Sequence, residues 1–248
     1  MSDFNRGYAR PIPADRADMS VDAGLRTFML GVYNKMALGL VLSAGLAYLT
    51  SSVPPVRDML FTVANGRVGY SILGMVVAFA PLAVLLFSGF AMKNQNPRSA
   101  SMVYWTVVSL IGASLGVVAL RYTGTSIAST FLITATAFGG LSLFGYTTKK
   151  DLTGMGSFLI MGVIGLIIAG LVNIFLQSSM MQFIISVLGV LIFAGLTAYD
   201  TQRLKMQYYD LGGDQAAMGI ATSYGALSLY LDFINMFQFL LALFGDRR

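Results

Sequence analysis

Two carboxylates stand within or at the edge of long apolar runs of this sequence. Asp200 lies near the end of the run that begins at Met180, and Asp232 lies inside the last run, in "SLYLDFINMF" from Ser228 to Phe237. Ionisable groups are costly at membrane depth, so such a pair favours a functional interpretation over a structural one. The structural alternative is that both aspartates only tie helices together through hydrogen bonds to Tyr, Ser or Asn.

Two kinds of chemistry are open to Asp200 and Asp232. Carboxylates that lie close together in a poorly hydrated place repel each other, and one shared proton relieves the repulsion. Such a pair is a pH sensor that needs no histidine. Once deprotonated, it is an oxygen-rich cation site, and calcium suits these ligands, with backbone carbonyls and water completing its shell. We therefore treat both aspartates as a candidate pH sensor and gate, and as transient calcium ligands.

Polar residues near the two carboxylates could support them. At about 100° per residue, Ser228, Asp232 and Asn235 fall on one stripe of the last helix, which should face the bundle interior. The hydroxyls of Tyr199 and Tyr230 could donate hydrogen bonds to the carboxylates, although aromatic packing explains both tyrosines nearly as well.

The residue types that are missing narrow the chemistry further. The sequence has no Cys and no His, and every side-chain carboxylate is an Asp. Disulfides, thiol nucleophiles, His-ligated metals and the usual histidine pH switch are therefore excluded for these residues. The net charge of +5 could suggest nucleic acid, but the basic residues are scattered between apolar runs. We expect no nucleic-acid partner and no resident cofactor.

Seven apolar runs must position these residues. The chain is 56% hydrophobic. Each run has about the 20 residues that a helix needs to cross a bilayer, which predicts an all-α membrane protein with seven transmembrane helices. With ends placed to within ~4 residues, the predicted helices are Phe28–Thr50, Tyr70–Met92, Ser101–Leu120, Ser126–Thr147, Met155–Leu176, Met180–Gln202 and Ile220–Phe244.

The segment before the first run is polar and contains two close prolines. We expect a flexible cytoplasmic tail, 1–24, followed by one transmembrane domain, 25–248. Lys and Arg on the side of the tail outnumber those on the other side about two to one, which predicts a cytoplasmic N-terminus and an external C-terminus. Arg247 and Arg248 count against this topology, since a last helix that failed to cross would return them to the inside.

Three stretches carry a resemblance to a known family. They are "TATAFGGLSLFGYTTKKDLT" (Thr134–Thr153), "FAGLTAYDTQRLK" (Phe193–Lys205) and "ALSLYLDFINMFQFLLALFG" (Ala226–Gly245). The first stretch follows the core of the fourth predicted helix, the second ends the sixth helix, and the third runs through the seventh. In this order they resemble the Bax-inhibitor family, the transmembrane Bax inhibitor motif proteins. The tail and loops are similar to those of a bacterial member, which implies a multi-pass protein of the bacterial inner membrane.

The resemblance implies a fold and a function. The last helix would lie at the centre of the bundle, wrapped by the other six. The protein would leak calcium across the lipid bilayer in a pH-dependent way, with Asp200 and Asp232 as the paired-aspartate sensor. In the family a basic residue near the inner end of the second helix can latch this pair, and the candidates here are Lys93 and Arg98. Lys35, in the first helix, can reach the inner surface or pair with a buried Asp.

Two other functions remain open on the residues alone. An intramembrane aspartyl protease is one, because two carboxylates that share a proton could activate water. That class has GxGD at its second aspartate, whereas this chain has "LYLD" (Leu229–Asp232), so we expect no enzyme. The other is a non-conducting interaction protein of the membrane. Some bacterial relatives associate with a membrane-anchored AAA+ protease and modulate it, and such a partner would recognise the tail.

Overall fold

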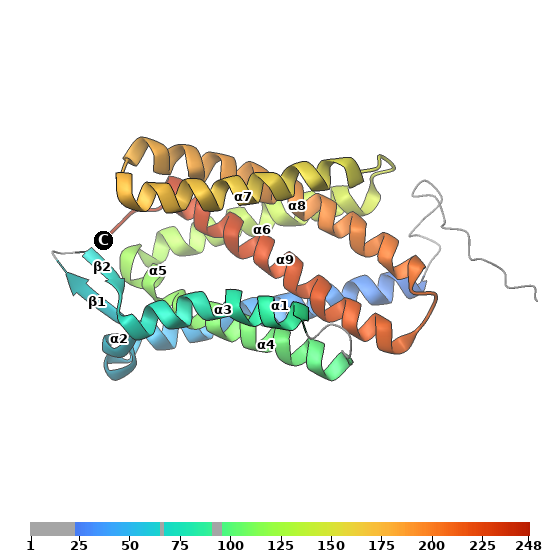
Figure 1. Ribbon diagram of the computed structural model, residues 1–248, viewed down its shortest axis with the longest axis horizontal. Helices are drawn as coiled ribbons and strands as arrows, with labels where there is room; N and C mark the ends of the chain where they lie inside the picture. The colour runs from blue at the N-terminus through green and yellow to red at the C-terminus, as the bar shows by residue number, and fades with distance from the viewer. Residues whose placement is uncertain (1–22, 65–66, 91–95) are drawn as a thin grey trace, which may run out of the picture.

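Long helices run side by side along the molecule in the computed structural model, which describes residues 23–64, 67–90 and 96–248 (Figure 1). The elements are α1 (Ala23–Ser52), α2 (Pro54–Leu60), β1 (Phe61–Ala64), β2 (Arg67–Tyr70), α3 (Ile72–Phe90), α4 (Pro97–Ser114), α5 (Gly116–Arg121), α6 (Gly124–Thr147), α7 (Thr153–Leu176), α8 (Ser179–Asp210) and α9 (Gln215–Phe244). Within the described ranges, seven spans are long and apolar enough to cross a membrane, with α4 and α5 together forming one of them. The predicted all-α membrane fold is confirmed.

Short polar motifs determine where several spans begin. Asn96 and Ser99 form a capping box at the start of α4, each side chain bonding to the backbone of the other. Asp214 accepts hydrogen bonds from two backbone N–H groups at the start of α9. Between α8 and α9 the chain turns through Gly212 and Gly213, whose positive φ angles glycine adopts without strain. These caps and turns set which residues of neighbouring helices share the same depth.

Three predicted helix limits are wrong at one end of the bundle. α1 includes Ala23, five residues before the predicted start at Phe28. α8 continues to Asp210, about two turns beyond the predicted end at Gln202, and α9 begins at Gln215 rather than near Ile220. Hydropathy marks where a helix leaves the hydrocarbon, whereas backbone hydrogen bonding continues until a residue interrupts it. Between Gln202 and Gly212 the chain has no Gly or Pro that could interrupt this bonding.

A small antiparallel hairpin was not predicted. β1 pairs with β2, so that Phe61 lies opposite Tyr70 and Thr62 lies opposite Gly69. The second predicted helix, which is α3, therefore begins at Ile72, after the hairpin, rather than at Tyr70. The hairpin and α2 form the connection between α1 and α3 at one end of the bundle (Figure 1).

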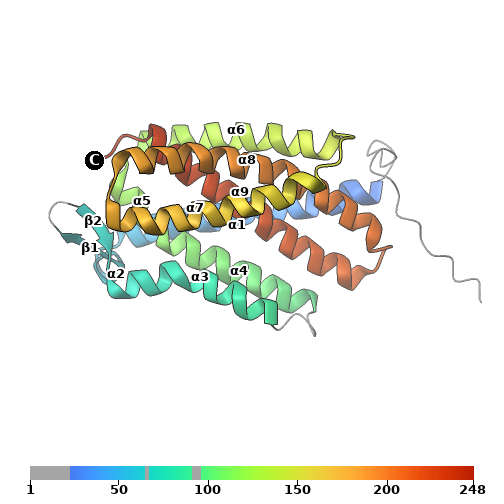
Figure 2. The same ribbon diagram turned by 45° about the horizontal axis from the view of Figure 1, so that its top comes forward.

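α9 is the central helix. It packs against α1, α4, α6 and α8. Of its most apolar window, 56% is buried, compared with 11–33% for the other spans. In both ribbon views α9 crosses obliquely between α6, α7 and α8 on one side and α1, α3 and α4 on the other (Figure 1 and Figure 2). The predicted central position of the last helix is confirmed.

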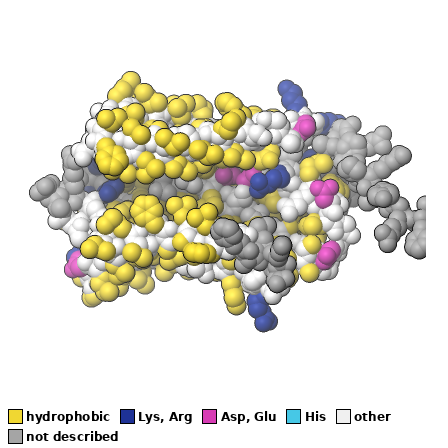
Figure 3. All heavy atoms as spheres, viewed as in Figure 1, with side chains coloured by type: hydrophobic (Ala, Val, Ile, Leu, Met, Phe, Trp, Pro, Cys, Tyr) yellow, Lys and Arg dark blue, Asp and Glu magenta, His cyan; other side chains and the backbone are white. Residues whose placement is uncertain are grey.

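The surface between the two ends is apolar. Figure 3 shows hydrophobic side chains over much of this surface, whereas most charged side chains lie toward the ends. Phe79 on α3, Phe158 on α7 and Phe175 near the end of α7 are among the exposed large side chains. Such a belt suits contact with lipid rather than with water.

The two ends of the described chain lie at opposite ends of the bundle (Figure 1). The backbone N–H of Arg248 donates to the carbonyl of Arg121 at 2.9 Å, and Arg247 forms an isolated β-bridge with Tyr122. The last helix therefore crosses fully, and Arg247 and Arg248 do not return to the end where α1 begins. Which end is cytoplasmic stays a prediction. The predicted tail, 1–24, lies outside the described residues except for its last two positions, which belong to α1.

Candidate functional site

The two predicted aspartates lie on helices that pack against each other. Asp200 projects from α8 and Asp232 from α9. Each residue is only 4% exposed. The carboxylate of Asp200 is close enough for its charge to act on Asp232. The structure thus brings together two acidic groups from separate spans in the interior of the bundle.

Ser228 connects the two helices at this point. Its hydroxyl donates a hydrogen bond to Oδ2 of Asp200. Ser228 and Asp232 are four residues apart and therefore share one face of α9, as the stripe predicted. Asn235, the third member of the stripe, donates instead to the carbonyl of Leu231 in its own helix, at 2.8 Å.

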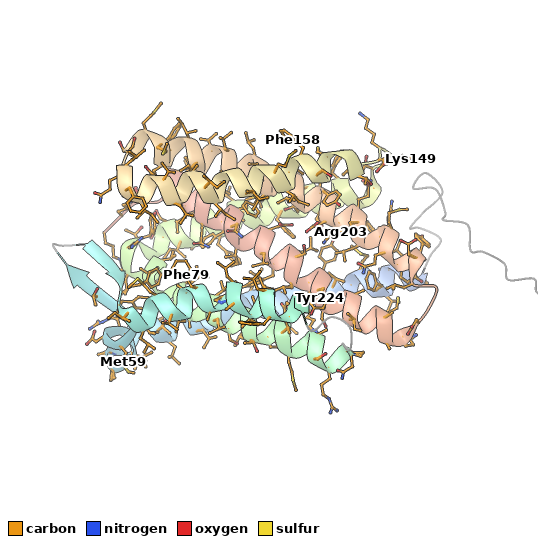
Figure 4. The ribbon with its side chains drawn as sticks, in the orientation of Figure 1. Met59, Phe79, Lys149, Phe158, Arg203 and Tyr224 are labelled. Atoms are coloured by element: carbon orange, nitrogen blue, oxygen red, sulfur yellow. The ribbon has the colours of Figure 1, made fainter. Side chains whose placement is uncertain are left out.

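Arg203 supplies a positive charge that the sequence did not assign to the site. Its Nη2 lies 3.3 Å from Oδ1 of Asp200, and the same nitrogen lies 3.3 Å from the hydroxyl of Ser228. The guanidinium also lies over the ring of Tyr199, 5.7 Å from the ring centroid. The arginine side chain is 47% exposed and that of Asp200 only 6%, so a half-exposed cation covers a buried carboxylate. The labelled Arg203 in Figure 4 lies between α8 and α9.

One oxygen of the pair has no hydrogen-bond partner. Oδ2 of Asp232 is buried and accepts no hydrogen bond from any described residue. A buried carboxylate oxygen without a partner is costly. A proton or a hard cation would satisfy it, so this position is open to both kinds of chemistry predicted for the pair.

Sequence comparison agrees with this architecture. A family model described as inhibitor of apoptosis-promoting Bax1 matches residues 25–248. The chain belongs to the Bax inhibitor family. A protein of Caulobacter vibrioides is 72% identical over the full length of both chains. The inner membrane protein YbhL of Escherichia coli strain K12 is 40% identical over 91% of this chain and 94% of its own.

A third relative is also named as a membrane protein. A membrane protein of Streptococcus pyogenes is 35% identical to this Bax inhibitor family member, over 90% of this chain and 94% of its own. The names of these relatives and the seven apolar spans agree on a multi-pass membrane protein. The predicted family is confirmed, and the orientation of the N-terminus stays a prediction.

The two tyrosines do not support the aspartates in the way that was predicted. The hydroxyl of Tyr230 forms a 2.6 Å hydrogen bond with that of Ser43 on α1. Tyr199 contributes its ring to Arg203. Among the described contacts, neither hydroxyl donates to a carboxylate, so that prediction is wrong. At about 100° per residue, Tyr199 points about 100° away from Asp200, and Tyr230, two positions before Asp232, points to nearly the opposite side of α9.

The predicted latch residues lie elsewhere or cannot be placed. The ammonium group of Lys35 donates to the hydroxyls of Ser101 (3.0 Å) and Ser223 (2.8 Å). Arg98 is exposed on α4 and forms no ion pair within the described part of the chain. Lys93 lies outside the described residues. Arg203 is the cation that meets Asp200, because it lies one turn further along the same helix and needs only a short reach.

The turn of α8 that follows the first aspartate is fixed to the connection between α6 and α7. The side-chain amide of Gln202 accepts from the N–H of Leu152 and donates to the carbonyl of Lys150, both at 2.8 Å. Lys205 is 2% exposed and donates to the carbonyl of Tyr146, near the end of α6, at 3.2 Å. These contacts fix the rotation of α8 and thereby the direction in which its carboxylate points.

The site offers hard oxygen ligands, but few of them. In the part of the chain that the structure describes, no group of three or more His, Cys, Asp or Glu side chains could hold a metal ion. Two carboxylates and the hydroxyl of Ser228 suit calcium, which takes roughly six to eight oxygen ligands. Water and backbone carbonyls would have to supply the rest. This donor set fits a passing ion better than a resident one.

Proposed function

We propose that this protein is a pH-sensitive calcium leak channel of the bacterial inner membrane, gated by Asp200 and Asp232. One observation supports the proposal above the others. A buried carboxylate pair lies on the central contact of the bundle, with one oxygen that has no hydrogen-bond partner among the described residues and with the half-exposed guanidinium of Arg203 over it. Groups that are so costly to bury in a membrane are kept for ion or proton chemistry.

The proposed gate works through the contact between α8 and α9. When Asp200 is ionised, it accepts from Ser228 and attracts Arg203, which keeps the arginine over the pair. A proton on the pair removes the charge that holds the arginine, so Arg203 is released and the site is uncovered. Calcium then passes with transient contacts to the remaining carboxylate charge and to water. The leak therefore increases as the pH falls.

Calcium flux into proteoliposomes tests this proposal. The purified full-length protein would be reconstituted around a calcium-sensitive dye, and flux would be followed between about pH 6 and about pH 8. We expect the leak of the natural protein to rise toward acid. Asp200→Asn mimics the protonated state and should leak at every pH, whereas Asp232→Asn should lose most of the pH response.

Asp58→Asn is the matched control for this experiment. Asp58 is exposed on α2, where it pairs with Arg57, and it is remote in sequence from both α8 and α9. The control should keep the natural pH profile. Unchanged flux and an unchanged pH response in both Asp200→Asn and Asp232→Asn would rule out the aspartate gate.

The alternative is a non-conducting membrane protein that modulates a partner, such as a membrane-anchored AAA+ protease. Flux no greater than that of empty liposomes at any pH would favour it. Deletion of residues 1–22 then separates the two functions. An interaction protein that uses its tail would lose its effect on the partner, whereas a leak channel would continue to conduct.

A further inference from the structure

A cavity with a mixed polar and apolar lining lies beside Arg203, the residue that covers Asp200. It has a volume of ≈ 440 Å³ and lies between α8 and α9, with Arg203, Gln207 and Asp210 on one wall and Tyr224 on the other. Figure 4 labels Arg203 and Tyr224 on these two helices. The volume is within the range of roughly 300–1,000 Å³ that small-molecule sites occupy. The cavity is therefore large enough for a small polar group.

Arg203 has hydrogen-bond donors to spare in this cavity. Its contacts with Asp200 and Ser228 both use Nη2. A guanidinium carries five N–H donors in a fixed fork. Nε and Nη1 have no acceptor among the described residues, and the side chain is 47% exposed. The arginine can therefore bind a second acceptor from the cavity side.

Tyr224 adds an unsatisfied group on the opposite wall. Its hydroxyl is buried and has no hydrogen-bond partner within the described residues. A buried hydroxyl without a partner costs free energy, which a ligand with an acceptor oxygen would recover. The amide of Gln207 offers a further donor one turn from Arg203. Several donors around one space match a ligand with several acceptor oxygens and negative charge, and a phosphate group is the common ligand of that kind.

The position of the cavity along the bundle also suits a phosphate group. In Figure 3, acidic and basic atoms meet in the hollow between the α7–α8 half and the α3–α4 half, at the margin of the hydrophobic belt. Arg203 lies toward the end of the bundle that carries Lys149 (Figure 4). Lipid headgroups lie at this margin of a membrane protein. Asp210 is exposed at the end of α8, about 10 Å further along the helix than Arg203. The acidic residue is therefore at the rim of the cavity, and Arg203 lies deeper in it.

We propose that the α8–α9 cavity binds a phosphate group, from an anionic lipid headgroup or from free phosphate, and that the bound group competes with Asp200 for Arg203. The binding site stands on the donors around the cavity. Its regulatory consequence rests on the proposed leak, because a phosphate that draws Arg203 away uncovers the carboxylate pair without any change in pH. Bound phosphate thus raises the leak at neutral pH.

Lipid binding to the detergent-purified full chain tests the site. Retention of phosphatidylglycerol, of phosphatidylcholine and of inorganic phosphate would be measured separately by native mass spectrometry. We expect phosphatidylglycerol to bind more tightly than phosphatidylcholine, and Arg203→Gln to weaken its binding about tenfold. Tyr224→Phe, which keeps the ring, should weaken it by a smaller factor, and Asp210→Asn should strengthen it by removing repulsion. Competition by inorganic phosphate would identify free phosphate as a ligand too.

Arg98→Gln is the matched control, since Arg98 is an exposed arginine that does not line the cavity. It should bind phosphatidylglycerol like the natural protein. Equal losses in Arg98→Gln and Arg203→Gln would show general surface attraction and would overturn the site. Unchanged binding in both Arg203→Gln and Tyr224→Phe would overturn it as well.

Flux separates this inference from the proposed function. In liposomes at about pH 8, added phosphatidylglycerol should raise the leak of the natural protein severalfold, but not that of Arg203→Gln, whose pair is already uncovered. Specific binding at Arg203 with no flux in any lipid would refute the leak and leave the phosphate site standing. A pH-dependent leak with equal binding in Arg203→Gln and Arg98→Gln would refute the phosphate site and leave the leak standing.

Discussion

At the scale of single residues, the carboxylate pair is defined by what each oxygen contacts. Asp200 has partners for both oxygens, from Ser228 and from Arg203. Asp232 has a buried oxygen with none among the described residues. The two acids are therefore not equivalent. Asp200 holds the cation that covers the site and releases it when protonated, whereas Asp232 has the unpartnered oxygen that a passing ion can contact.

Replacing Arg203 by Gln should make the leak nearly independent of pH. The neutral side chain keeps a similar length but loses the charge that ionised Asp200 attracts, so the site stays uncovered. We expect flux at about pH 8 to approach the flux of the natural protein at about pH 6. Calcium entry into proteoliposomes measures this, with Arg98→Gln as the control. A natural pH profile in Arg203→Gln would contradict the role given to this residue.

The hydrogen bond between Tyr230 and Ser43 should contribute to stability rather than to gating. It joins α9 to α1 at 2.6 Å. Tyr230→Phe should lower the free energy of unfolding by about 1 kcal/mol, and the coupling in a double-mutant cycle with Ser43→Ala should be about 0.6 kcal/mol. Denaturation in mixed detergent micelles measures both values. A change in the pH profile of the leak with no change in stability would reverse this assignment.

The sequence predicts the two aspartates of the site but not its cation. Asp200 and Asp232 stand out because acids are rare inside apolar runs. In the sequence, Arg203 is one of the basic residues whose distribution predicts topology, since a basic residue near a helix end commonly faces the membrane surface. The signal that could have found it is its spacing of three residues from Asp200. The partners of Tyr230 and Lys35 depend on how α9 is rotated against α1 and α4, which no pattern within one helix can determine.

At the scale of helices, close backbone approach holds α8 in register with α6. A methyl group at Gly145 of α6 would lie 2.8 Å from both the carbonyl carbon and Cα of Ala198, two residues before Asp200. Backbone atoms cannot yield as a flexible side chain can. Small residues at such contacts let membrane helices pack tightly, and here the contact lies within one turn of Asp200 along α8.

Gly145→Ala should therefore destabilise the bundle, by about 1–3 kcal/mol. Gly140→Ala, in the same helix, is the matched control, because nothing lies within 4 Å of the added methyl group. That change should be neutral or raise stability by up to about 1 kcal/mol, since alanine is the better helix former. Thermal unfolding in detergent compares the two. Equal effects at both positions would show that close packing at Gly145 is not what matters.

Asp151, in the connection between α6 and α7, should contribute stability that depends on pH. Hydrogen bonds from Thr153, from its side chain first and its backbone N–H second, lower the pKa of Asp151 from its ordinary value of 3.8. A lowered folded pKa stabilises the protein above 3.8, and the contribution is lost as the pH falls through the folded pKa. Asp151→Asn should thus have a lower Tm than the natural protein at neutral pH, and the gap should close in acid. A gap that stays constant with pH would contradict this.

Hydropathy predicts the spans well but not their ends or connections. Seven runs and a central last helix follow from length, apolarity and the family resemblance. The extension of α8 to Asp210 could not be seen, because polar residues continue a helix as readily as apolar ones once it has left the hydrocarbon. The hairpin of β1 and β2 was missed because its strands are four residues each and adjoin apolar helices.

At the scale of the whole molecule, seven crossings place the described ends of the chain on opposite sides of the membrane. The start of α1 and the connection between α6 and α7 lie at one end, and the hairpin and the C-terminus lie at the other (Figure 1). The helix arrangement is compatible with either orientation in the membrane, so only the distribution of Lys and Arg predicts which end faces the cytoplasm.

Single cysteines can determine the orientation, because the natural chain has none. Lys150→Cys marks the connection between α6 and α7, and Thr62→Cys marks β1, where the side chain is exposed. A maleimide that cannot cross membranes should label Thr62→Cys in intact spheroplasts and should label Lys150→Cys only after lysis. The opposite labelling pattern would place the N-terminus outside and invert the predicted topology.

The contacts of Gln202 and Lys205 with the connection between α6 and α7 have a practical consequence. They tie a water-accessible segment to the turn of α8 that follows Asp200. A small antibody fragment that binds residues 148–152 would therefore immobilise this turn of α8 from the aqueous side. An inhibitor of this protein need not enter the bilayer.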